Sequence, residues 1–545
     1  MRAWVGTRRR LLRLASVGLG ALLAPRARAS VRQPLLSGVR VSTRRPFFGD
    51  RSSLATVGLA EGRESAQLHF VLGRPATVVL DTLATGQGIA AEQIDTDAGQ
   101  QTLGTRTLSL RAGSHSLEWA PDGSLPARTY LLRLRAEEAS GAVATQRSVV
   151  RLLGVDAGFT TLGAVPGGDA FLAVRTDAER FTAQLLHCGP EADLTYANDE
   201  LNGVPVADPL DIEWSRNVDR PATIRFRIGD WQSGVYAARL ETDDGRVGFA
   251  PLVVRPAAPK HRVAVVMPTS TWQAYNFYDA DGDGWGDTWY ARWKTIVVDP
   301  TRPHANRGVP YRFRSYDLQF LRWLAATGRE VDVYADEDLE RFSSPGDLRR
   351  AYALLVFPGH TEYVTTRLYD LVTGYRDLGG NLMFLSANNF FRRIDRSGRT
   401  LLFVDEWRTL GRPEATLCGV QYVASDRGER QAPFTVTGLD AAPWAFEGTG
   451  LEAGDPFGVY GIEIDARAWS SPPNMQVLAT IPDLFGPGRS AEMTYYEHAS
   501  GARVFSAGAL NFGGQMLVWP EATRLVENVW ARLGGPPAAD EPSLP

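Results

Sequence analysis

Three short segments of the chain carry side chains that could do chemistry. They are residues 271–276, 358–363 and 386–391. Among them are an imidazole at His360, a carboxylate at Glu362 and an amide at Asn388. A carboxylate, an imidazole and amides gathered at one place can hold a metal ion and orient a water molecule, whereas purely structural turns use Gly, Asp or Ser. The residue types therefore indicate a candidate site for metal-assisted chemistry.

The elements that precede these segments must position them. Each segment follows a continuous apolar run that is typical of a buried parallel strand. The predicted strands are residues 263–267, 331–334, 353–357 and 381–385, and the predicted helices are residues 316–326, 365–378 and 520–533. Alternating strands and helices predict a doubly wound α/β domain, which resembles flavodoxin-like and class I glutamine amidotransferase-like folds. Such domains collect ligands at the carboxyl ends of their strands.

The first half of the chain has a different pattern. Short runs alternate apolar and polar residues between Gly, Pro and Asp turns, as in residues 76–80, 130–135, 170–174 and 235–240. This alternation is typical of β-sandwiches. Residues 113–130 also resemble a hairpin of immunoglobulin-like modules in exported bacterial proteins.

The predicted domains follow these changes of pattern. Two immunoglobulin-like β-sandwiches precede the α/β domain, and a Pro-containing linker near residues 256–259 separates the second sandwich from it. The predicted bounds are residues 30–156 and 157–258 for the sandwiches, 259–535 for the α/β catalytic domain and 536–545 for a disordered tail.

The N-terminus resembles a twin-arginine export signal. Residues 7–13 read Thr-Arg-Arg-Arg-Leu-Leu-Arg, an apolar run follows to residue 24, and Ala27-Arg28-Ala29 has the small-residue pattern of a cleavage site. The alternative is a membrane anchor, but this run is too short to span about 30 Å of hydrocarbon. We therefore expect residues 1–29 to be removed. The mature protein would be periplasmic or secreted and would not be held in a membrane.

The composition excludes several classes of function. Hydrophobic residues make up 44% and charged residues 22% of the chain, which is globular rather than disordered. The formal net charge of −4 argues against a nucleic-acid partner. The two cysteines, Cys188 and Cys418, form no zinc or redox motif. We expect free buried thiols there, and a single disulfide is the alternative.

The chemistry-bearing segments together resemble one known family, the large subunits of N,N-dimethylformamidases. The matching segments are residues 272–276, 359–363 and 386–391, with further matches at 458–465 and 495–506. This resemblance implies hydrolysis of an amide C–N bond by a mononuclear ferric iron that two tyrosines and one glutamate hold. It also implies a small partner subunit or a homo-oligomer.

The resemblance assigns the iron ligands Tyr236, Tyr275 and Glu362 by their motifs. Phenolate and carboxylate oxygens are hard donors suited to a hard, highly charged cation. Taken alone, a strand tyrosine usually just covers a core with its hydroxyl in water. Only the occurrence of both tyrosines with Glu362 in matching motifs favours ligation.

The resemblance also assigns catalytic or supporting positions to His360, Asn388 and Glu497. Either Glu497 or His360 could carry a proton to the leaving amine. A strand-end histidine is usually structural, and an asparagine there usually caps a turn. Their placement beside a carboxylate favours function over these readings.

One segment departs from the family. Asp279, Asp281, Asp283 and Asp287 place carboxylates at alternate positions, as at the front of a calcium loop, but Tyr290 stands where a bidentate glutamate is expected. Calcium binding and an acidic surface turn both remain open. Because this insertion replaces a short Gly-rich loop that lines the family's pocket, the identity of the substrate is open too.

Two functions follow from the sequence. The first is an exported, Fe3+-dependent hydrolase of a small amide or a related C–N compound. The alternative is a non-catalytic cell-envelope module, in which the sandwiches bind carbohydrate or protein and the α/β domain has lost its chemistry.

Overall fold

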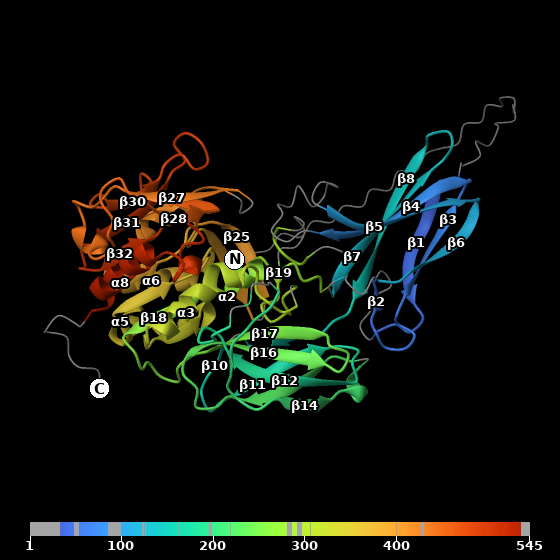
Figure 1. Cartoon of the computed structure of the whole chain (residues 1–545), viewed down its shortest axis with the longest axis horizontal. Coiled ribbons are helices and arrows are strands. Elements are labelled where there is room, and N and C mark those ends of the chain that lie inside the picture. Colours follow the sequence, from blue (N-terminus) through green and yellow to red (C-terminus); the bar gives the residue numbers. More distant parts are fainter. Residues whose placement is uncertain are drawn as a thin grey trace, which may run out of the picture.

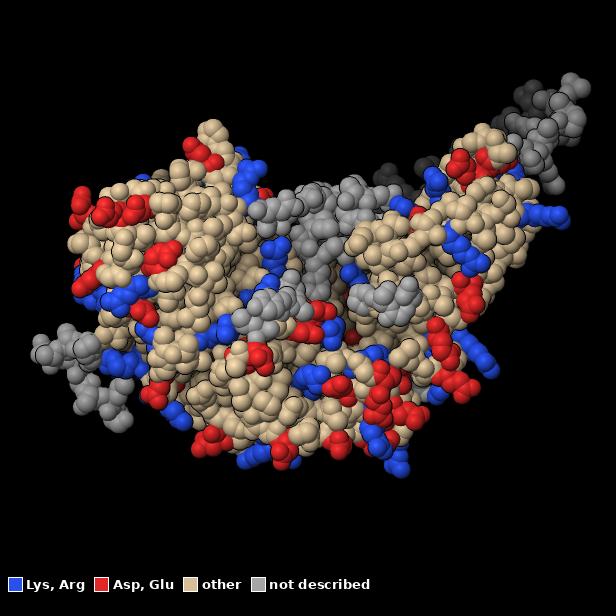
Figure 2. All heavy atoms as spheres, in the orientation of Figure 1, with Lys and Arg blue, Asp and Glu red and all other residues tan. Residues whose placement is uncertain are grey.

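The chain folds into three β-rich parts that follow one another in sequence (Figure 1). The computed structural model describes residues 33–47, 54–85, 100–121, 125, 127–161, 163–193, 195, 199–218, 220–280, 286–290, 297–305, 307–398, 400–426 and 430–535. The predicted signal at residues 1–29 and the predicted tail at 536–545 lie outside these residues. Within them, no helix has the length and apolar character that crossing a membrane requires. Acidic and basic side chains are interspersed over the visible face of the molecule (Figure 2).

The first part consists of two sheets with a shared core. Its described strands are β1 (Leu36–Thr43), β2 (Leu54–Val57), β3 (Ala66–Leu72), β4 (Ala76–Thr85), β5 (Gln100–Leu110), β6 (Gly113–Trp119), β7 (Arg128–Glu137) and β8 (Val143–Leu152). The strand orders are β1-β3-β6 and β2-β8-β7-β4-β5. Alternate residues of β3, such as Leu68 and Phe70, are buried in the core between the sheets, because successive side chains of a strand point to opposite faces.

The second part is also a pair of sheets. Its described elements are β9 (Asp156–Phe159), β10 (Gly163–Ala164), β11 (Asp169–Arg175), β12 (Arg180–His187), β13 (Val204–Pro205), β14 (Leu210–Glu213), η2 (Ser215–Asn217), β15 (Ala222–Arg227), β16 (Gly234–Thr242) and β17 (Val247–Val254). One sheet has the order β10-β17-β16-β12-β13, with β14 beside β12, and the other has the order β15-β11-β9. Phe181, Trp214 and Phe226 fill the core between them.

The C-terminal part is built on one large mixed sheet. Its described strands are β18 (Val263–Met267), β20 (Asp332–Ala335), β21 (Leu354–Phe357), β23 (Asn381–Phe384), β27 (Gln431–Val436), β28 (Pro456–Gly461), β30 (Gln476–Ile481), β31 (Ala491–Glu497) and β32 (Arg503–Ser506). Their order is β20-β18-β21-β23-β32-β31-β30-β27-β28. The pairs from β20 to β32 are parallel, and the pairs from β32 to β28 are antiparallel.

Helices and two smaller sheets surround this mixed sheet. The helices are α2 (Thr269–Ala274), η3 (Arg314–Leu318, a π-helix), α3 (Gln319–Ala326), α4 (Asp336–Leu339), α5 (Pro345–Ala351), α6 (Thr366–Asp377), α7 (Ala415–Cys418), η4 (Pro443–Phe446), η5 (Gly513–Gln515) and α8 (Pro520–Gly534). The smaller sheets contain β19 (Val297–Val298), β22 (Tyr363–Thr365), β24 (Arg392–Ser397) and β25 (Thr400–Glu406), and β26 (Gln421–Ser425) with β29 (Glu463–Ala466). The start of α6 is fixed by Thr365, whose hydroxyl accepts a hydrogen bond from the Leu368 N–H.

The prediction of a multidomain, β-rich chain is confirmed in the described residues, which contain many strands and few helices. Strands β18, β20, β21 and β23 lie where the continuous apolar runs predict them, whereas the parallel strand β32 was not predicted. The doubly wound α/β domain and its likeness to flavodoxin-like and glutamine amidotransferase-like domains stay predictions. The second sandwich is not simply tethered by its linker: Phe249 and Val253 share one hydrophobic cluster with Phe313 and Trp323 of the C-terminal part. Both cysteines, Cys188 and Cys418, are free and buried.

Candidate active site

The two segments that follow β18 and β21 are tied to each other at the carboxyl ends of these strands. Thr271 lies in α2, directly after β18, and its hydroxyl accepts hydrogen bonds from the N–H groups of Glu362 and Tyr363, each at 3.1 Å. Tyr275 ends the same helix, and its N–H donates to the Thr271 carbonyl. A single threonine therefore sets the distance between the tyrosine segment and the glutamate segment.

Four side chains then converge in what we call the tyrosine–glutamate cluster, Tyr275, Tyr290, Glu362 and Tyr363. The Tyr275 hydroxyl donates to Glu362 Oε2 at 2.6 Å. The Tyr290 hydroxyl lies 3.0 Å from the Tyr275 hydroxyl and 3.3 and 3.4 Å from the two carboxylate oxygens. It also shares a hydrogen bond with the Tyr363 hydroxyl. Three phenol oxygens and one carboxylate thus meet in the protein interior, where Glu362 is only 1% exposed.

Burial controls the protonation of these phenols. It raises the pKa of Tyr275, Tyr290 and Tyr363 well above the ordinary value, and the negative charge of Glu362 adds to the rise. A phenol here would lose its proton only if a positive charge took its place. The set is therefore suited to a cation that can replace protons.

Arg392 holds the glutamate from the opposite side. Its Nε donates to Glu362 Oε1 at 2.9 Å, and its guanidinium lies over the rings of Phe391 and Phe403, at 4.8 and 5.5 Å from their centres. The arginine therefore occupies one carboxylate oxygen and leaves the other directed toward Tyr275.

A second group of polar side chains adjoins the cluster. His360 Nε2 lies 3.4 Å from Glu362 Oε2 and 3.6 Å from Glu463 Oε2. Asn388 donates from Nδ2 to Glu463 Oε2 at 2.8 Å. Its N–H donates to Asp465 Oδ1 at 2.8 Å, and its φ of 56° is left-handed. This strained backbone at a strand end directs the asparagine side chain toward Glu463.

The groups around His360 are buried and tend to be uncharged. Burial raises the pKa of Glu463 to about 8, with a further contribution from the charge of Glu362. Burial also lowers the pKa of His360, against the opposing effect of Glu362. Asn388 Oδ1 is buried and has no hydrogen-bond partner among the described residues. The site thus offers a protonated carboxyl, a neutral imidazole and a free acceptor.

The structure brings together four of the residues that the sequence singles out and leaves two apart. Tyr275, His360, Glu362 and Asn388 lie in the site, as given above. None of the described contacts of Tyr236 is in the site: its hydroxyl donates to the Gln232 carbonyl at 2.8 Å, and its ring stacks on His187 and Trp231 in the second sandwich.

Glu497, the second residue left apart, lies at the end of β31. It accepts from the Tyr495 hydroxyl at 2.6 Å, pairs with Arg532 at 3.3 Å and has half of its side chain exposed. The described contacts of Glu497 are therefore at the surface, and the carboxylate that lies beside His360 and Asn388 is that of Glu463. The sequence alone could have indicated Glu463, because this residue lies inside the matching segment at residues 458–465.

The aspartate loop has contacts of its own. The carbonyl of Asp279 accepts from Arg151 Nη2 at 2.6 Å, and the Asp287 carboxylate accepts from the Ala280 N–H at 2.7 Å. Asp281 and Asp283 lie outside the described residues, so calcium binding stays a prediction. Tyr290, at the end of this loop, belongs to the site. From the sequence, Tyr290 was considered only as the residue that makes the calcium pattern incomplete, and this position was therefore not predicted.

Metal binding here would depend on phenols. No group of three or more His, Cys, Asp or Glu side chains that could hold a metal ion occurs in the described part of the chain. The tyrosine–glutamate cluster is not a group of that kind, because its donors are mostly phenol oxygens of tyrosines. These donors are hard oxygens, which suit a ferric ion.

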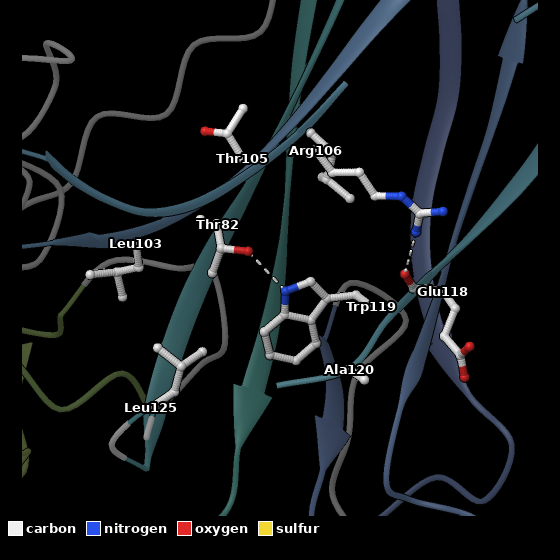
Figure 3. Close-up of a pocket in the computed structure, with 10 residues that line it drawn as sticks. Thr82, Leu103, Thr105, Arg106, Glu118, Trp119, Ala120 and Leu125 are labelled. Atoms are coloured by element: carbon white, nitrogen blue, oxygen red, sulfur yellow. Dashed lines mark hydrogen bonds between the residues drawn. The ribbon is translucent and has the colours of Figure 1, made fainter. Parts of the chain in front are cut away.

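A cavity of about 520 Å³ lies in the first sandwich, beside β4, β5 and the end of β6 (Figure 3). Trp119 donates from Nε1 to the Thr82 hydroxyl at 2.9 Å and is only 6% exposed. Arg106 donates to the Glu118 carbonyl at 3.5 Å. A sugar ring needs an open aromatic face and free polar groups, so a buried indole with its N–H already bonded does not favour carbohydrate binding.

Comparison with known proteins matches the part of the chain that contains the candidate site. The model of the family "N,N-dimethylformamidase beta subunit-like, C-terminal" matches residues 204–524, more than half of the chain. The chain is 23% identical over 325 residues to the N,N-dimethylformamidase beta subunit of Alcaligenes sp. and 25% identical over 333 residues to that of Paracoccus aminophilus. Each match covers 49% of this chain and 42% of the relative, so the chain spans less than half the length of these curated relatives.

Among solved structures, a crystal structure of Salmonella alpha-2-macroglobulin reacted with methylamine is similar over 42% of this chain and 18% of its own. The sequence identity is 10% and the TM-score is 0.23, which is too low to indicate a shared fold.

Proposed function

The chain belongs to the N,N-dimethylformamidase beta subunit-like family over residues 204–524, and we propose from this premise that it is a hydrolase of amide C–N bonds in small substrates. The observation that carries the proposal is the tyrosine–glutamate cluster. Its phenol and carboxylate oxygens lie within hydrogen-bond distance of one another in a buried position.

The proposed cofactor is a single ferric ion held by Tyr275, Tyr290 and Glu362. These three side chains are favoured over a set containing Tyr236, because Tyr236 has its contacts in the second sandwich. A bound ferric ion would polarise the amide carbonyl and lower the pKa of water in the site. Arg392 supports this set by fixing the orientation of the Glu362 carboxylate.

The proton transfers are proposed for His360 and Glu463. His360 is buried and its pKa is lowered, so its neutral ring can accept a proton from water at Nε2. Glu463, with a pKa near 8, is protonated at neutral pH and can donate its proton to the leaving amine. Asn388 holds Glu463 through Nδ2 and presents its free Oδ1 to the N–H of a substrate.

Export and assembly are further parts of the proposal. The twin-arginine-like residues 7–13 support export of a folded, metal-loaded chain to the periplasm or the medium. The matched relatives are named as beta subunits, which supports a partner subunit or an oligomer.

The test is iron content and colour. Chain purified under iron-replete conditions is expected to contain one iron, to show a phenolate-to-iron absorption band in the visible range, and to hydrolyse small formamides. Tyr275→Phe and Tyr290→Phe should each weaken or abolish the band.

The matched control is Tyr236→Phe, which removes the same atom from a tyrosine in the second sandwich and should keep both iron and band. Loss of iron in Tyr236→Phe with retention in Tyr290→Phe would reverse the ligand assignment. Colourless, inactive wild type would favour the non-catalytic module instead.

A further inference from the structure

Strand β29 presents two carboxylates on one face, those of Glu463 and Asp465. Residues two apart in a strand share a face, and Ile464 between them is buried in the hydrophobic core instead. Both carboxylates bind the same residue. Asn388 donates from Nδ2 to Glu463 Oε2 and from its backbone N–H to Asp465 Oδ1, each at 2.8 Å. The proposed proton transfers use Glu463 and leave Asp465, which is only 1% exposed, without a role.

The backbone of β29 is fixed along both edges. One edge pairs with β26 in an antiparallel ladder. At the other edge, the N–H of Asp465 donates to the Gly508 carbonyl and the N–H of Leu510 donates to the Glu463 carbonyl, each at 3.0 Å. The strand therefore holds the two carboxylates at a constant spacing, and it can serve as a rigid support for a neighbouring segment.

Asn388 lies in a segment that needs such support. It follows β23, and both Asn388 and Phe390 are left-handed, with φ values of 56° and 58°. A conformation of this kind costs about 1–3 kcal/mol at each residue and persists only where surrounding contacts hold it. The hydrogen bond from the Asn388 N–H to the Asp465 carboxylate is such a contact, and it forms in the protein interior, where Asn388 is buried.

The Asn388 side chain lies between the two groups proposed for proton transfer. Its Nδ2 is 2.8 Å from Glu463 Oε2 and 3.4 Å from His360 Nε2. Its Oδ1 is buried and has no hydrogen-bond partner among the described residues. An asparagine that only formed a turn would bond its side chain to nearby backbone groups. The orientation of this amide therefore matters to the site, and that orientation depends on the backbone of Asn388.

We propose that Asp465 is a positioning residue, which holds the backbone of Asn388 so that the Asn388 amide stays on Glu463 and orients the carboxyl that protonates the leaving amine. The inference rests on the proposed function and deepens it by adding a residue that touches neither the substrate nor the proposed iron. Because Asp465 acts only through Asn388, its effect on the reaction disappears when the Asn388 amide is removed.

The first experiment measures kcat for a small formamide on the full iron-loaded chain. Asp465→Leu keeps much of the side-chain shape and removes the acceptor, so kcat should fall roughly tenfold, which corresponds to one hydrogen bond. Asp465→Asn keeps an oxygen that can accept from the Asn388 N–H, so it should recover most of the loss. Asp465→Ala makes the same test if the leucine variant does not fold. An asparagine variant as slow as the leucine variant, or a leucine variant as fast as wild type, would overturn the inference.

The second experiment is a double-mutant cycle with Asn388→Ala. If Asp465 acts through the Asn388 amide, Asp465→Leu should change kcat by less than about twofold in the Asn388→Ala background, because residues that act as a unit are not additive. A further loss of roughly tenfold in the double variant would mean that Asp465 acts by another route, and would contradict the inference.

The matched control is Asp332→Leu, which removes another buried carboxylate that accepts from a backbone N–H. Asp332 begins β20, at the end of the sheet away from the site, and its Oδ2 accepts from the Lys260 N–H at 2.8 Å. This variant should lower the thermal midpoint and keep kcat when assayed well below that midpoint. Equal losses of kcat in Asp332→Leu and Asp465→Leu would assign the effect to general destabilisation and reject a positioning role.

Crystal structures of wild type and Asp465→Leu separate this inference from the amidase proposal. In the variant, the Asn388 backbone should leave its left-handed conformation, and Nδ2 should move beyond hydrogen-bond distance of Glu463 Oε2. An unchanged contact would overturn the inference whatever the activity. If wild type hydrolyses no formamide, the amidase proposal fails, and the same pair of structures still decides whether Asp465 holds Asn388 on Glu463.

Discussion

Burial in the candidate site raises the pKa of a carboxyl group and lowers the pKa of an imidazole, and both shifts favour the uncharged form. Glu463 keeps its proton to about pH 8, and His360 has a lowered pKa. A proton donor and a proton acceptor therefore lie close together at neutral pH, with His360 Nε2 3.6 Å from Glu463 Oε2. This pairing is what acid/base hydrolysis requires.

The first prediction at this scale concerns Glu463→Gln. The variant keeps the shape and loses the proton donor, so kcat on a small formamide should fall by roughly 10²- to 10⁴-fold. In wild type the acid form disappears as the pH rises through about 8, so kcat should decline on the alkaline side. The variant should lack this decline in a pH profile of kcat.

Glu497→Gln is the control for this change, because Glu497 is half exposed and bonded to Tyr495 and Arg532. A larger loss of kcat in Glu497→Gln than in Glu463→Gln would restore the original assignment of the acid/base residue.

Local motifs were sufficient to predict that Tyr275, His360, Glu362 and Asn388 lie close together, because each belongs to a segment that follows an easily recognised apolar strand. They were insufficient for Arg392, which reaches Glu362 only after the intervening strand β22 and loop have folded back. Tyr236 was selected by motif and by its place on a strand. Motif likeness cannot show that a hydroxyl is already bonded within its own sandwich.

At the scale of elements, the buried parallel strands were the most predictable. All five residues of β18 and all four of β21 are buried, so their continuous apolar runs have no competing explanation. The π-helix η3 was predicted only as part of a helix over residues 316–326, because its backbone pattern leaves no mark in the periodicity of apolar residues. The antiparallel half of the large sheet follows irregular sequence and was not resolved into strands.

A prediction follows for the carboxyl that η3 buries. Asp317 accepts from Trp272 Nε1 at 3.2 Å, and burial raises the pKa of Asp317 to about 7. Because the pKa of Asp317 is raised in the folded protein, the contribution of this carboxyl to the free energy of unfolding is fully present below its pKa in the unfolded chain, near 4. This contribution is lost as the pH rises through about 7. Asp317→Asn mimics the protonated form, so its advantage over wild type should grow between pH 5 and pH 8, to a few kcal/mol at most.

Thermal midpoints of both proteins at pH 5 and pH 8 measure this effect. Asp370→Asn serves as the control, because Asp370 on α6 is exposed and pairs with Arg412, and its difference from wild type should not grow with pH. An equal difference for Asp317→Asn at both pH values would contradict a raised pKa of Asp317.

At the scale of the molecule, both sandwiches contact the chain that leaves Tyr275. Phe277 packs against Leu83 and Leu131 of the first sandwich. The Tyr278 hydroxyl donates to Asp156 Oδ2 at 2.7 Å, where the second sandwich begins. The site segment is therefore held between three parts of the fold, and the sandwiches have a role in positioning the site that does not require them to bind a ligand.

The last prediction tests this positioning through Arg151, a buried residue of β8 whose Nη2 donates to the Asp279 carbonyl at 2.6 Å. Arg151→Met keeps much of the side-chain volume and leaves that carbonyl without its donor, at a cost of about 1–3 kcal/mol. The loss falls on the segment between Tyr275 and Tyr290, so limited proteolysis should cut there faster and iron should be released more readily to a chelator. Arg147→Met, on an exposed position of the same strand, should resemble wild type. If Arg151→Met also resembled wild type in both measurements, the first sandwich would have no part in holding the site.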